Sequence, residues 1–563
     1  MAKKEILLLI FIIAIGAFFR FYLLTEIPPG LYIDEAANGN NAVEALETGS
    51  FKIFYPENTG REGLFINIQA LSVWVFGNEP WALRLVSAIF GVLTILGIYL
   101  LAKELFRNYQ FSIINFQSSP NESIFKRLKI KKLEHLLKIR NWKIENYETI
   151  ALLSAFFLAT SYWHINFSRI GFRAILIPFL ATFGMYWLLK GLRTGKISSF
   201  LLAGFFSGLG FHSYIAFRFM PLVFIIPLIF AFAKWWRGKF QFCMPCGIAL
   251  FLLVGIVVAI PIGYYFLQNP DDFFGRSKAV SIFSAASPMK EFIKSNALTM
   301  GMFFFRGDCN FRHNYACNPF LLVGLLASLG LIVLLRRRSI ANNSLPVLLL
   351  PLWLLIMSLP ATLTRESVPH ALRSIGIMPP LYILAGFGAW WIIEKSFIWL
   401  RRQKEKYPVK LVQLERIKKE AVFLLILFLF FVPFSAFIKY FQRWAYDPRT
   451  EAAFSIDLAH IGKYLNTLPG DTRKFVIVNH SDIMIRGISA AAQVPMFFTN
   501  TFSEKSRIDK RIYYIQSADE ISFKPEESVV IIPMDQKTRK EIAERFPGFK
   551  AKIKQSFVAF ENF

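Results

Sequence analysis

The residues best suited to chemistry are carboxylates and cations that stand between long apolar runs. Asp34 and Glu35 form an adjacent pair just after the first apolar run, and Arg61 and Glu62 follow in the same polar stretch. Cations gather at later boundaries between apolar and polar sequence. A carboxylate can take a proton from an acceptor hydroxyl while arginines hold an anionic leaving group. The pattern therefore favours Asp34 and Glu35 as catalytic groups and the later cations as an anion site.

A phosphate fits these cations, because the arginine fork matches phosphate oxygens bidentately. A lipid tail on that phosphate would suit the apolar surface beneath. We expect the donor phosphate to be bound by arginines at these boundaries, namely Arg169, Arg173, Arg218, Arg365 and Arg373. We expect further substrate contacts from side chains nearby, namely Arg61, Glu62, His212, Tyr214, His313 and His370.

Each of these assignments has a structural alternative. Asp34 precedes an expected short helix from Glu35 to Leu46 and could be only its N-cap. Glu35 could orient the acceptor or simply sit in the first turn near the helix dipole. The arginines could be interfacial anchors, because arginine snorkels readily at helix ends. His212 and His370 could be interfacial histidines with no part in the chemistry.

The composition places these residues in a membrane protein. The chain has 563 residues, of which 55% are hydrophobic and 61 are Phe, and its mean hydropathy is +0.43. A run of roughly 20 apolar residues spans the hydrocarbon core, so the sequence predicts a mainly helical fold with about eleven transmembrane helices. The runs are Ile6–Leu24, Leu83–Ala102, Ile150–Tyr162, Ala174–Leu189, Phe200–Phe211, Phe219–Ala233, Gly247–Leu267, Phe320–Leu335, Leu345–Leu359, Ile375–Ile393 and Ala421–Phe437.

The basic residues predict the threading of these helices. Lys and Arg concentrate in cytoplasmic loops, and one alternating count places every strongly basic loop on the same side as Lys3 and Lys4. The largest basic cluster falls in the predicted cytoplasmic loop 103–149 and consists of Lys126, Arg127, Lys129, Lys131, Lys132, Lys138 and Arg140. The net charge of +26 is thereby explained by an anionic lipid surface as partner, and nucleic acid is not expected.

The chain is expected to divide into two domains. Residues 1–438 form the multi-helix membrane domain, in which loops 25–80 and 268–318 lie outside the cytoplasm and the first of them carries the chemistry. Residues 439–563 have ordinary polar composition, and short strands alternate there with helical patterns, which is typical of a small α/β domain. The expected strands are Phe475–Val478, Ile512–Ile515 and Ser528–Ile532, and the expected helices Ala453–Leu465 and Thr538–Phe546. An odd helix count places this domain outside the cytoplasm of a plasma-membrane protein.

The cysteines and the loop around them leave alternatives open. Cys309 and Cys317 share an outer loop and could form a disulfide or remain two free thiols. Cys243 and Cys246 lack the second ligand pair that a zinc site needs, so no metal ligands are assigned, although a divalent metal remains open as a cofactor. The loop Arg306–Asn318 mixes aromatic and polar groups that suit sugar binding, or it is an ordinary capped loop.

The outer loops resemble those of the GT-C membrane glycosyltransferases, in particular family 39, the group of protein O-mannosyltransferases and aminoarabinose transferases. Those enzymes carry an Asp-Glu pair in the first outer loop, matched here by Asp34 and Glu35. Their Lys-Pro-Pro-like segment is replaced here by residues 60–64, Gly-Arg-Glu-Gly-Leu, and a later Arg-Tyr-x-x-Pro-like segment by residues 369–374. The likeness extends from Ile6 to about Gly195 and again over that later loop.

The resemblance implies an inverting sugar transfer on the extracytoplasmic side. Asp34 would deprotonate an acceptor hydroxyl on a protein, lipid or glycan, which would attack a sugar carried on a polyprenyl phosphate. No nucleotide sugar would be needed. The alternatives are a lipid or glycolipid flippase or transporter, which usually carries intramembrane charges that these runs almost lack at their centres, another lipid-linked sugar enzyme such as an oligosaccharyltransferase, and a scaffold whose outer domain does the work.

Overall fold

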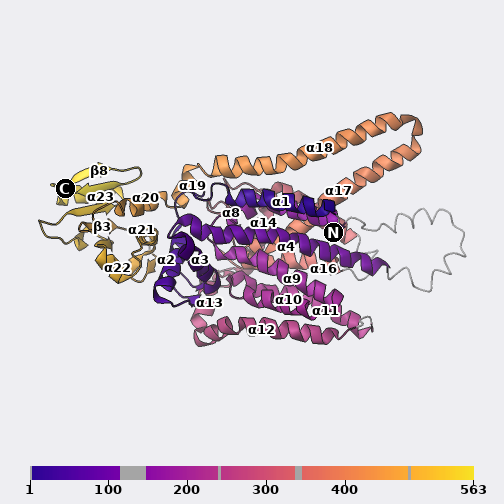
Figure 1. Cartoon of the computed structure of the whole chain (residues 1–563), viewed down its shortest axis with the longest axis horizontal. Coiled ribbons are helices and arrows are strands. Elements are labelled where there is room, and N and C mark those ends of the chain that lie inside the picture. Colours follow the sequence, from indigo (N-terminus) through magenta and orange to yellow (C-terminus); the bar gives the residue numbers. More distant parts are fainter. Residues whose placement is uncertain (1–2, 115–146, 239–241, 337–344, 480–482) are drawn as a thin grey trace, which may run out of the picture.

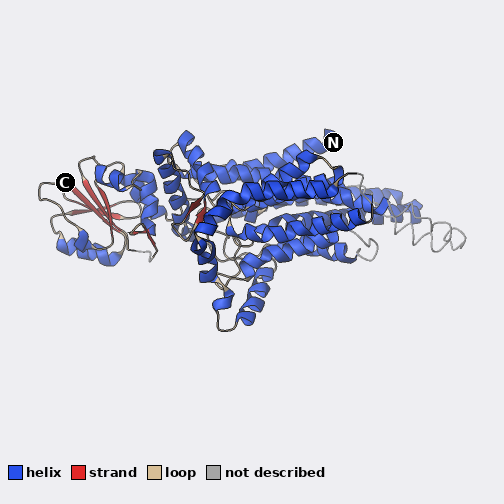
Figure 2. Ribbon diagram, turned by 90° about the horizontal axis from the view of Figure 1, so that it is seen from below, coloured by secondary structure: helices blue, strands red, loops and turns tan. Residues whose placement is uncertain are grey.

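The computed structural model describes residues 3–114, 147–238, 242–336, 345–479 and 483–563. A bundle of long helices fills the centre, and a small domain containing a β-sheet lies at one end (Figures 1 and 2). At the opposite end, the helical hairpin of α17 (Met378–Lys406) and α18 (Leu411–Phe437) projects beyond the bundle (Figure 1). The basic cluster predicted in loop 103–149 lies outside the described residues.

The helices of the bundle coincide with the apolar runs, and each run lies on one of them. Besides α17 and α18 they are α1 (Lys3–Phe21), α4 (Pro80–Ile114), α7 (Tyr147–Ala159), α9 (Leu176–Thr194), α10 (Ile197–Gly210), α11 (Met220–Trp236), α12 (Met244–Gln268), α15 (Leu321–Arg336) and α16 (Leu345–Thr362). Within the described ranges, seven helices are long and apolar enough to cross a membrane by length and composition: those containing α4, α9, α11, α12, α16, α17 and α18. The chain is therefore a multi-pass membrane protein, while the number of crossings stays a prediction.

Exposed apolar side chains mark where lipid covers the bundle. On α12 the outward residues include Leu253 and Ile256, and on α18 they include Phe423 and Phe430. Such a surface is stable only against hydrocarbon, because soluble proteins rarely expose contiguous apolar patches of this extent. The last helix continues as a π-helix from Ile438 to Trp444 before the polar sequence begins.

Short elements fill the spaces between the long helices. The first outer loop folds into α2 (Ile33–Thr48), the two-stranded hairpin β1 (Phe54–Tyr55) and β2 (Arg61–Glu62), and α3 (Gly63–Phe76). Later short helices are α8 (Tyr162–Phe167), α13 (Pro270–Val280), α14 (Pro288–Gly301) and the 3-10 turns Arg173–Ile175, Ile215–Phe219, Ile282–Ser284, Ile375–Ile377 and Pro408–Lys410. The helices α2, α3 and α13 lie at the end of the bundle that faces the C-terminal domain (Figure 1).

The C-terminal domain is a five-stranded sheet with helices on both faces, which confirms the expected α/β class. The strand order is β6-β3-β7-β9-β8, with β6, β3 and β7 parallel and the last two strands antiparallel. Its elements are α19 (Pro448–Ala453), α20 (Ile456–Leu465), β3 (Arg473–Ile477), β4 (Met484–Ile485), β5 (Ile488–Ser489), a 3-10 turn (Ala490–Ala492), α21 (Gln493–Thr499), α22 (Glu504–Asp509), β6 (Ile512–Ile515), a 3-10 turn (Ala518–Glu520), β7 (Val529–Pro533), α23 (Gln536–Arg545), β8 (Lys550–Ile553) and β9 (Val558–Glu561). The three expected strands correspond to β3, β6 and β7.

One hydrophobic cluster joins the two domains through α2. Ala36, Ala37 and Val43 of α2 pack in the same core as Ile461 of α20 and Phe497 of α21. Because successive residues of a strand face opposite sides, Val476 and Val530 of the sheet also enter this core, while their neighbours face a second core beneath α23. The helix that carries Asp34 is thus fixed between the bundle and the C-terminal domain.

Candidate active site

Glu35 is a buried structural anchor in the first turn of α2. Its side chain is 0% exposed, and its two carboxylate oxygens accept from Nε of Arg84 at 3.0 Å and Nη2 at 3.1 Å. It also accepts the backbone N–H groups of Gly171 at 2.7 Å and Tyr32 at 3.2 Å. A Cβ at Gly171 would lie 3.3 Å from the Glu35 carboxylate, so only glycine allows this close approach. The carboxylate is fully used in joining α2, α4 and the start of the α9 segment.

Asp34, one residue earlier, faces a different environment. Tyr32 is the N-cap residue of α2, so Asp34 stands at the second helical position and the cap-only alternative does not apply. The side chain is partly exposed, and its Oδ1 accepts from Nδ2 of Asn58 at 2.7 Å. The helix N-terminus stabilises its negative charge.

Arg61 supports the same helix from inside the first loop. Its guanidinium is buried and donates to Oδ1 of Asn38 at 2.8 Å and Oδ1 of Asn41 at 2.5 Å, both on α2. Burial lowers the pKa of Arg61 to about 10, the charge of Arg173 acts in the same direction, and the charge of Asp34 opposes both. Arg61 therefore remains a cation at neutral pH and lies within electrostatic reach of Asp34 and Arg173.

Glu62, Arg173 and Tyr214 come together as the sequence predicted. Nε of Arg173 donates to the Glu62 carboxylate at 2.8 Å, and Nη2 donates to the Gly60 carbonyl at 3.2 Å. The guanidinium lies 5.2 Å from the centre of the Tyr214 ring. Arg173 is partly exposed, so it borders the cluster formed by Asp34 and Arg61.

Arg169 is buried and occupied by backbone, unlike Arg173 four residues later. Its Nη1 and Nη2 donate to the carbonyls of Phe19 at 3.1 Å and Ile27 at 2.8 Å. Its guanidinium stacks on Tyr440 and Phe441, and burial lowers its pKa. These contacts close the C-terminal end of α1, so we no longer count Arg169 among the phosphate ligands.

Two further predicted residues bind backbone at the end of α10 and η2. Nε2 of His212 lies 2.9 Å from the Val258 carbonyl, and burial lowers the pKa of His212, which keeps it neutral at neutral pH. Arg218 donates to the Phe273 carbonyl at 2.8 Å and lies 4.0 Å from the centre of the Phe273 ring. These contacts tie the 3-10 turn before α11 to α12 and α13.

The cations of the last outer loop are held by that loop itself. Nη1 of Arg373 donates to Oγ1 of Thr364 at 2.8 Å and to the Glu366 carbonyl at 3.1 Å. The side chain of Arg365 is exposed, and its backbone N–H donates to the Val280 carbonyl at 3.1 Å. Both arginines thus carry charge on a surface loop without a printed carboxylate partner that would neutralise either of them among the described residues.

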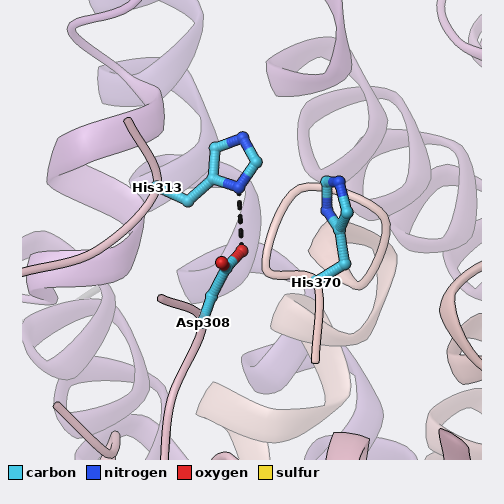
Figure 3. A group of neighbouring side chains, drawn as sticks. All are labelled: Asp308, His313 and His370. Carbon is cyan, nitrogen blue, oxygen red and sulfur yellow. Dashed lines mark hydrogen bonds and ion pairs between the residues drawn. The ribbon is translucent and has the colours of Figure 1, made fainter. Parts of the chain in front are cut away.

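Asp308, His313 and His370 form a cluster that joins two outer loops (Figure 3). Oδ2 of Asp308 accepts from Nδ1 of His313 and from the Ala371 backbone, both at 2.8 Å, while Oδ1 accepts the Asn310 N–H at 2.8 Å. The ring of His370 lies 4.8 Å from the ring of His313 between centroids. The three ligand atoms lie within 4.8 Å of one another, so the cluster could hold a divalent cation that takes nitrogen and oxygen ligands. The disulfide Cys309–Cys317 closes this loop, which decides between the two alternatives for these cysteines, and Cys243 and Cys246 are bonded as well.

Aromatic rings connect this cluster to the Asp34 region. The ring of His313 lies 6.4 Å from that of Phe172, which in turn lies 5.7 Å from Tyr32. The guanidinium of Arg312 lies 4.1 Å from the centre of the Tyr32 ring. Because Phe172 directly precedes Arg173 and Tyr32 lies two residues before Asp34, the groups predicted from distant parts of the sequence share one region.

The sequence reasoning missed the amides that organise this region. Asn38 and Asn41 hold Arg61, and Asn58 holds Asp34. A signal was present, because Asp34, Asn38 and Asn41 are spaced four and three residues apart and so lie on one face of a helix. Nothing local marked Asn58, which reaches Asp34 only through the hairpin fold.

Comparisons with known proteins agree with this fold. The sequence model of the dolichyl-phosphate-mannose-protein mannosyltransferase family matches residues 64–117. The structure of ArnT from Cupriavidus metallidurans bound to undecaprenyl phosphate superposes with a TM-score of 0.57 at 12% identity, covering 100% of this chain and 99% of ArnT. ArnT in the apo state gives a TM-score of 0.55 at 13% identity, covering 100% and 98%. No curated protein matches the sequence significantly.

The predicted resemblance to the GT-C membrane glycosyltransferases is thereby confirmed. It holds for the fold over the whole chain and for sequence over residues 64–117. The predicted mainly helical membrane architecture with a small C-terminal α/β domain is confirmed with it.

Proposed function

We propose that this protein transfers a sugar from a polyprenyl-phosphate donor to an acceptor hydroxyl on the extracytoplasmic side, with Asp34 as the general base. The observation that carries the proposal is the contrast between the two adjacent carboxylates. Glu35 accepts four hydrogen bonds and is 0% exposed. Within the described part of the chain, partly exposed Asp34 accepts one, from Asn58. A general base needs an oxygen that can reach the acceptor's proton, so Glu35 serves as a positioning residue.

The donor class is supported by the comparisons and by the arginines. The matching family is described as using dolichyl-phosphate mannose, and ArnT was solved with undecaprenyl phosphate. Arg173 borders the Asp34 cluster, while Arg365 and Arg373 lie on the last outer loop. We assign the donor phosphate to these three arginines, because charge-assisted bidentate contacts to phosphate are their strongest use.

The reaction balances without a further reactant. The acceptor oxygen attacks the anomeric carbon as Asp34 takes its proton, and the bond between that carbon and the phosphate oxygen breaks. The electron pair leaves with the lipid phosphate, whose added charge the arginines stabilise. Attack opposite to the leaving group inverts the anomeric configuration. The acceptor is a protein, a lipid or a glycan.

The test is sugar transfer in membranes that contain the parent or the Asp34→Asn variant. Radiolabelled undecaprenyl-phosphate mannose, glucose and aminoarabinose serve as donors, and label is counted in protein, lipid and glycan fractions. We expect transfer by the parent and a loss of about 10²–10⁴-fold in the variant, the usual contribution of general-base catalysis. Equal transfer by both would refute the role of Asp34, and no transfer from any donor would favour a flippase.

Asp457 provides a matched control. It is a partly exposed aspartate at the second position of α20, as Asp34 is of α2. The Asp457→Asn variant makes the same change of charge at an equivalent helix position and should transfer sugar like the parent.

A further inference from the structure

One arginine of the C-terminal domain reaches across to the first outer loop. Nη1 and Nη2 of Arg486 donate to the two carboxylate oxygens of Glu44 at 2.7 and 2.8 Å. Nε donates to Oε1 of Glu57 at 2.8 Å, and Nη2 lies 2.7 Å from the same carboxylate. The guanidinium also stacks on Phe502 at 4.4 Å. Arg486 therefore binds α2 and the turn between β1 and β2 at once.

The backbone at Arg486 is unusual for arginine. Arg486 and Gly487 form the two-residue turn between β4 and β5, and their φ angles are 52° and 77°. Such turns favour Asn-Gly, because other side chains are strained at positive φ. An arginine at the first position accepts this cost, and what it places there is the fork that holds Glu44 and Glu57.

The turn that Arg486 holds is itself strained. Asn58, Thr59 and Gly60 have φ angles of 52°, 65° and 82° in succession. Glycine adopts this region freely, but the β-branched Thr59 does not. Residues in such conformations persist only where their surroundings hold them there.

This strained turn supplies the contact to Asp34. Asn58 donates to Oδ1 of Asp34 at 2.7 Å, directly after Glu57 in the chain. Oε2 of Glu57 also accepts from Asn41, which holds Arg61. A contact from the C-terminal domain is thus linked through Glu57 to both groups nearest the proposed base.

We propose that Arg486 is a positioning residue for the transfer reaction, holding Glu44 and Glu57 so that the 58–60 turn presents Asn58 to Asp34. The proposal rests on the proposed function for the reaction, but the clamp is also measurable without it. The C-terminal domain thereby becomes part of the active site's support, in addition to any role in acceptor binding. Docking of the domain does not depend on Arg486, since the core that joins α2 to α20 and α21 remains.

The experiment compares Arg486→Gln with Arg511→Gln in the full chain. Arg511 is a matched control, an exposed arginine of the same domain with a φ of 51°, whose Nη1 donates to the Asp471 carbonyl within that domain. Transfer from undecaprenyl-phosphate sugars gives kcat and KM, and hydrogen exchange of the peptide covering residues 52–63 reports the turn. We expect R486Q to lower kcat about tenfold with KM within about twofold and to speed exchange, while R511Q matches the parent.

Further variants separate positioning from general stability. R486K keeps the charge but lacks the fork, so its kcat should fall between the parent and R486Q. If Arg486 acts through Glu57, the double variant R486Q/E57Q should lose no more activity than the worse single variant. Unchanged exchange in R486Q would overturn the clamp, and faster exchange with parental kcat would overturn its role in the reaction. A parent that transfers no sugar would refute the proposed function, while the exchange measurement would still decide the clamp.

Discussion

The first outer loop and the later outer loops both carry many charges, but they hold them in opposite ways. In the first loop, cations pair with carboxylates, as in Glu35–Arg84 and Glu62–Arg173. In the last loop, Arg373 binds a hydroxyl and a carbonyl of its own loop, and Arg365 is exposed. The first loop is preorganised around α2, whereas the last one presents charge that a ligand can use.

This difference suggests a division of labour. A proton acceptor needs a fixed position, which buried pairs provide at the cost of desolvation. A phosphate site needs cations whose charge is not already neutralised by carboxylates. The two kinds of loop meet through the rings of Tyr32, Phe172 and His313.

Breaking the buried pair should have the largest effect on stability. Arg84→Ala leaves Glu35 buried without its cation, and such a loss costs about 3–5 kcal/mol. Arg545→Ala breaks the exposed pair with Asp519, where about 0–1 kcal/mol is expected. Thermal unfolding in detergent micelles measures both. Equal unfolding temperatures would mean that the first loop is not preorganised by this pair.

Opening the disulfide of the later loop should have the next largest effect. Cys309 and Cys317 are separated by 8 positions, and closing so short a loop contributes about 2–3 kcal/mol. The C309S/C317S variant should therefore order its loop less well and bind undecaprenyl phosphate more weakly, by about fivefold in a titration. C243S/C246S, at the start of α12, is the control and should bind like the parent.

Arg169 and Arg173 offer a comparison four residues apart. Arg169→Gln leaves the carbonyls of Phe19 and Ile27 without their donor, which costs about 1–3 kcal/mol and lowers the unfolding temperature. Arg173→Gln should lower sugar transfer about 10–100-fold at a nearly unchanged unfolding temperature, because it removes charge at the proposed phosphate site. If R169Q loses transfer without losing stability, Arg169 belongs to the donor site after all.

The sequence predicted the elements better than it predicted the contacts. The eleven apolar runs lie on helices because a membrane demands long apolar stretches, and β3, β6 and β7 were found because buried parallel strands are apolar throughout. The antiparallel β8 was missed because it is an exposed edge strand, Lys-Ala-Lys-Ile.

Roles within a motif were harder, because distant residues decide them. Asp34 and Glu35 are indistinguishable as a pair, and what separates them is Arg84, 49 positions away from Glu35, together with Gly171. Arg169 is buried because the end of α1 offers it carbonyls, which nothing in its own neighbourhood announces. Local pattern therefore identified the region, whereas tertiary contacts assigned the work within it.

The smallest effect concerns how acid loosens the contact between the C-terminal domain and the first loop. The hydrogen bonds from Arg486 are the main reason that the pKa of Glu44 is lowered. A lowered pKa contributes stability above the unfolded value of about 4.3, and that contribution is lost as pH falls through the folded value. Both side chains are partly exposed, so we expect less than about 1 kcal/mol. Hydrogen exchange of residues 52–63 at pH 6 and pH 4 should show acid loosening in the parent and a weaker pH dependence in Glu44→Gln. The same pH dependence in both would mean that Glu57 alone carries the contact, and the preorganisation of the first loop would then depend on one carboxylate rather than two.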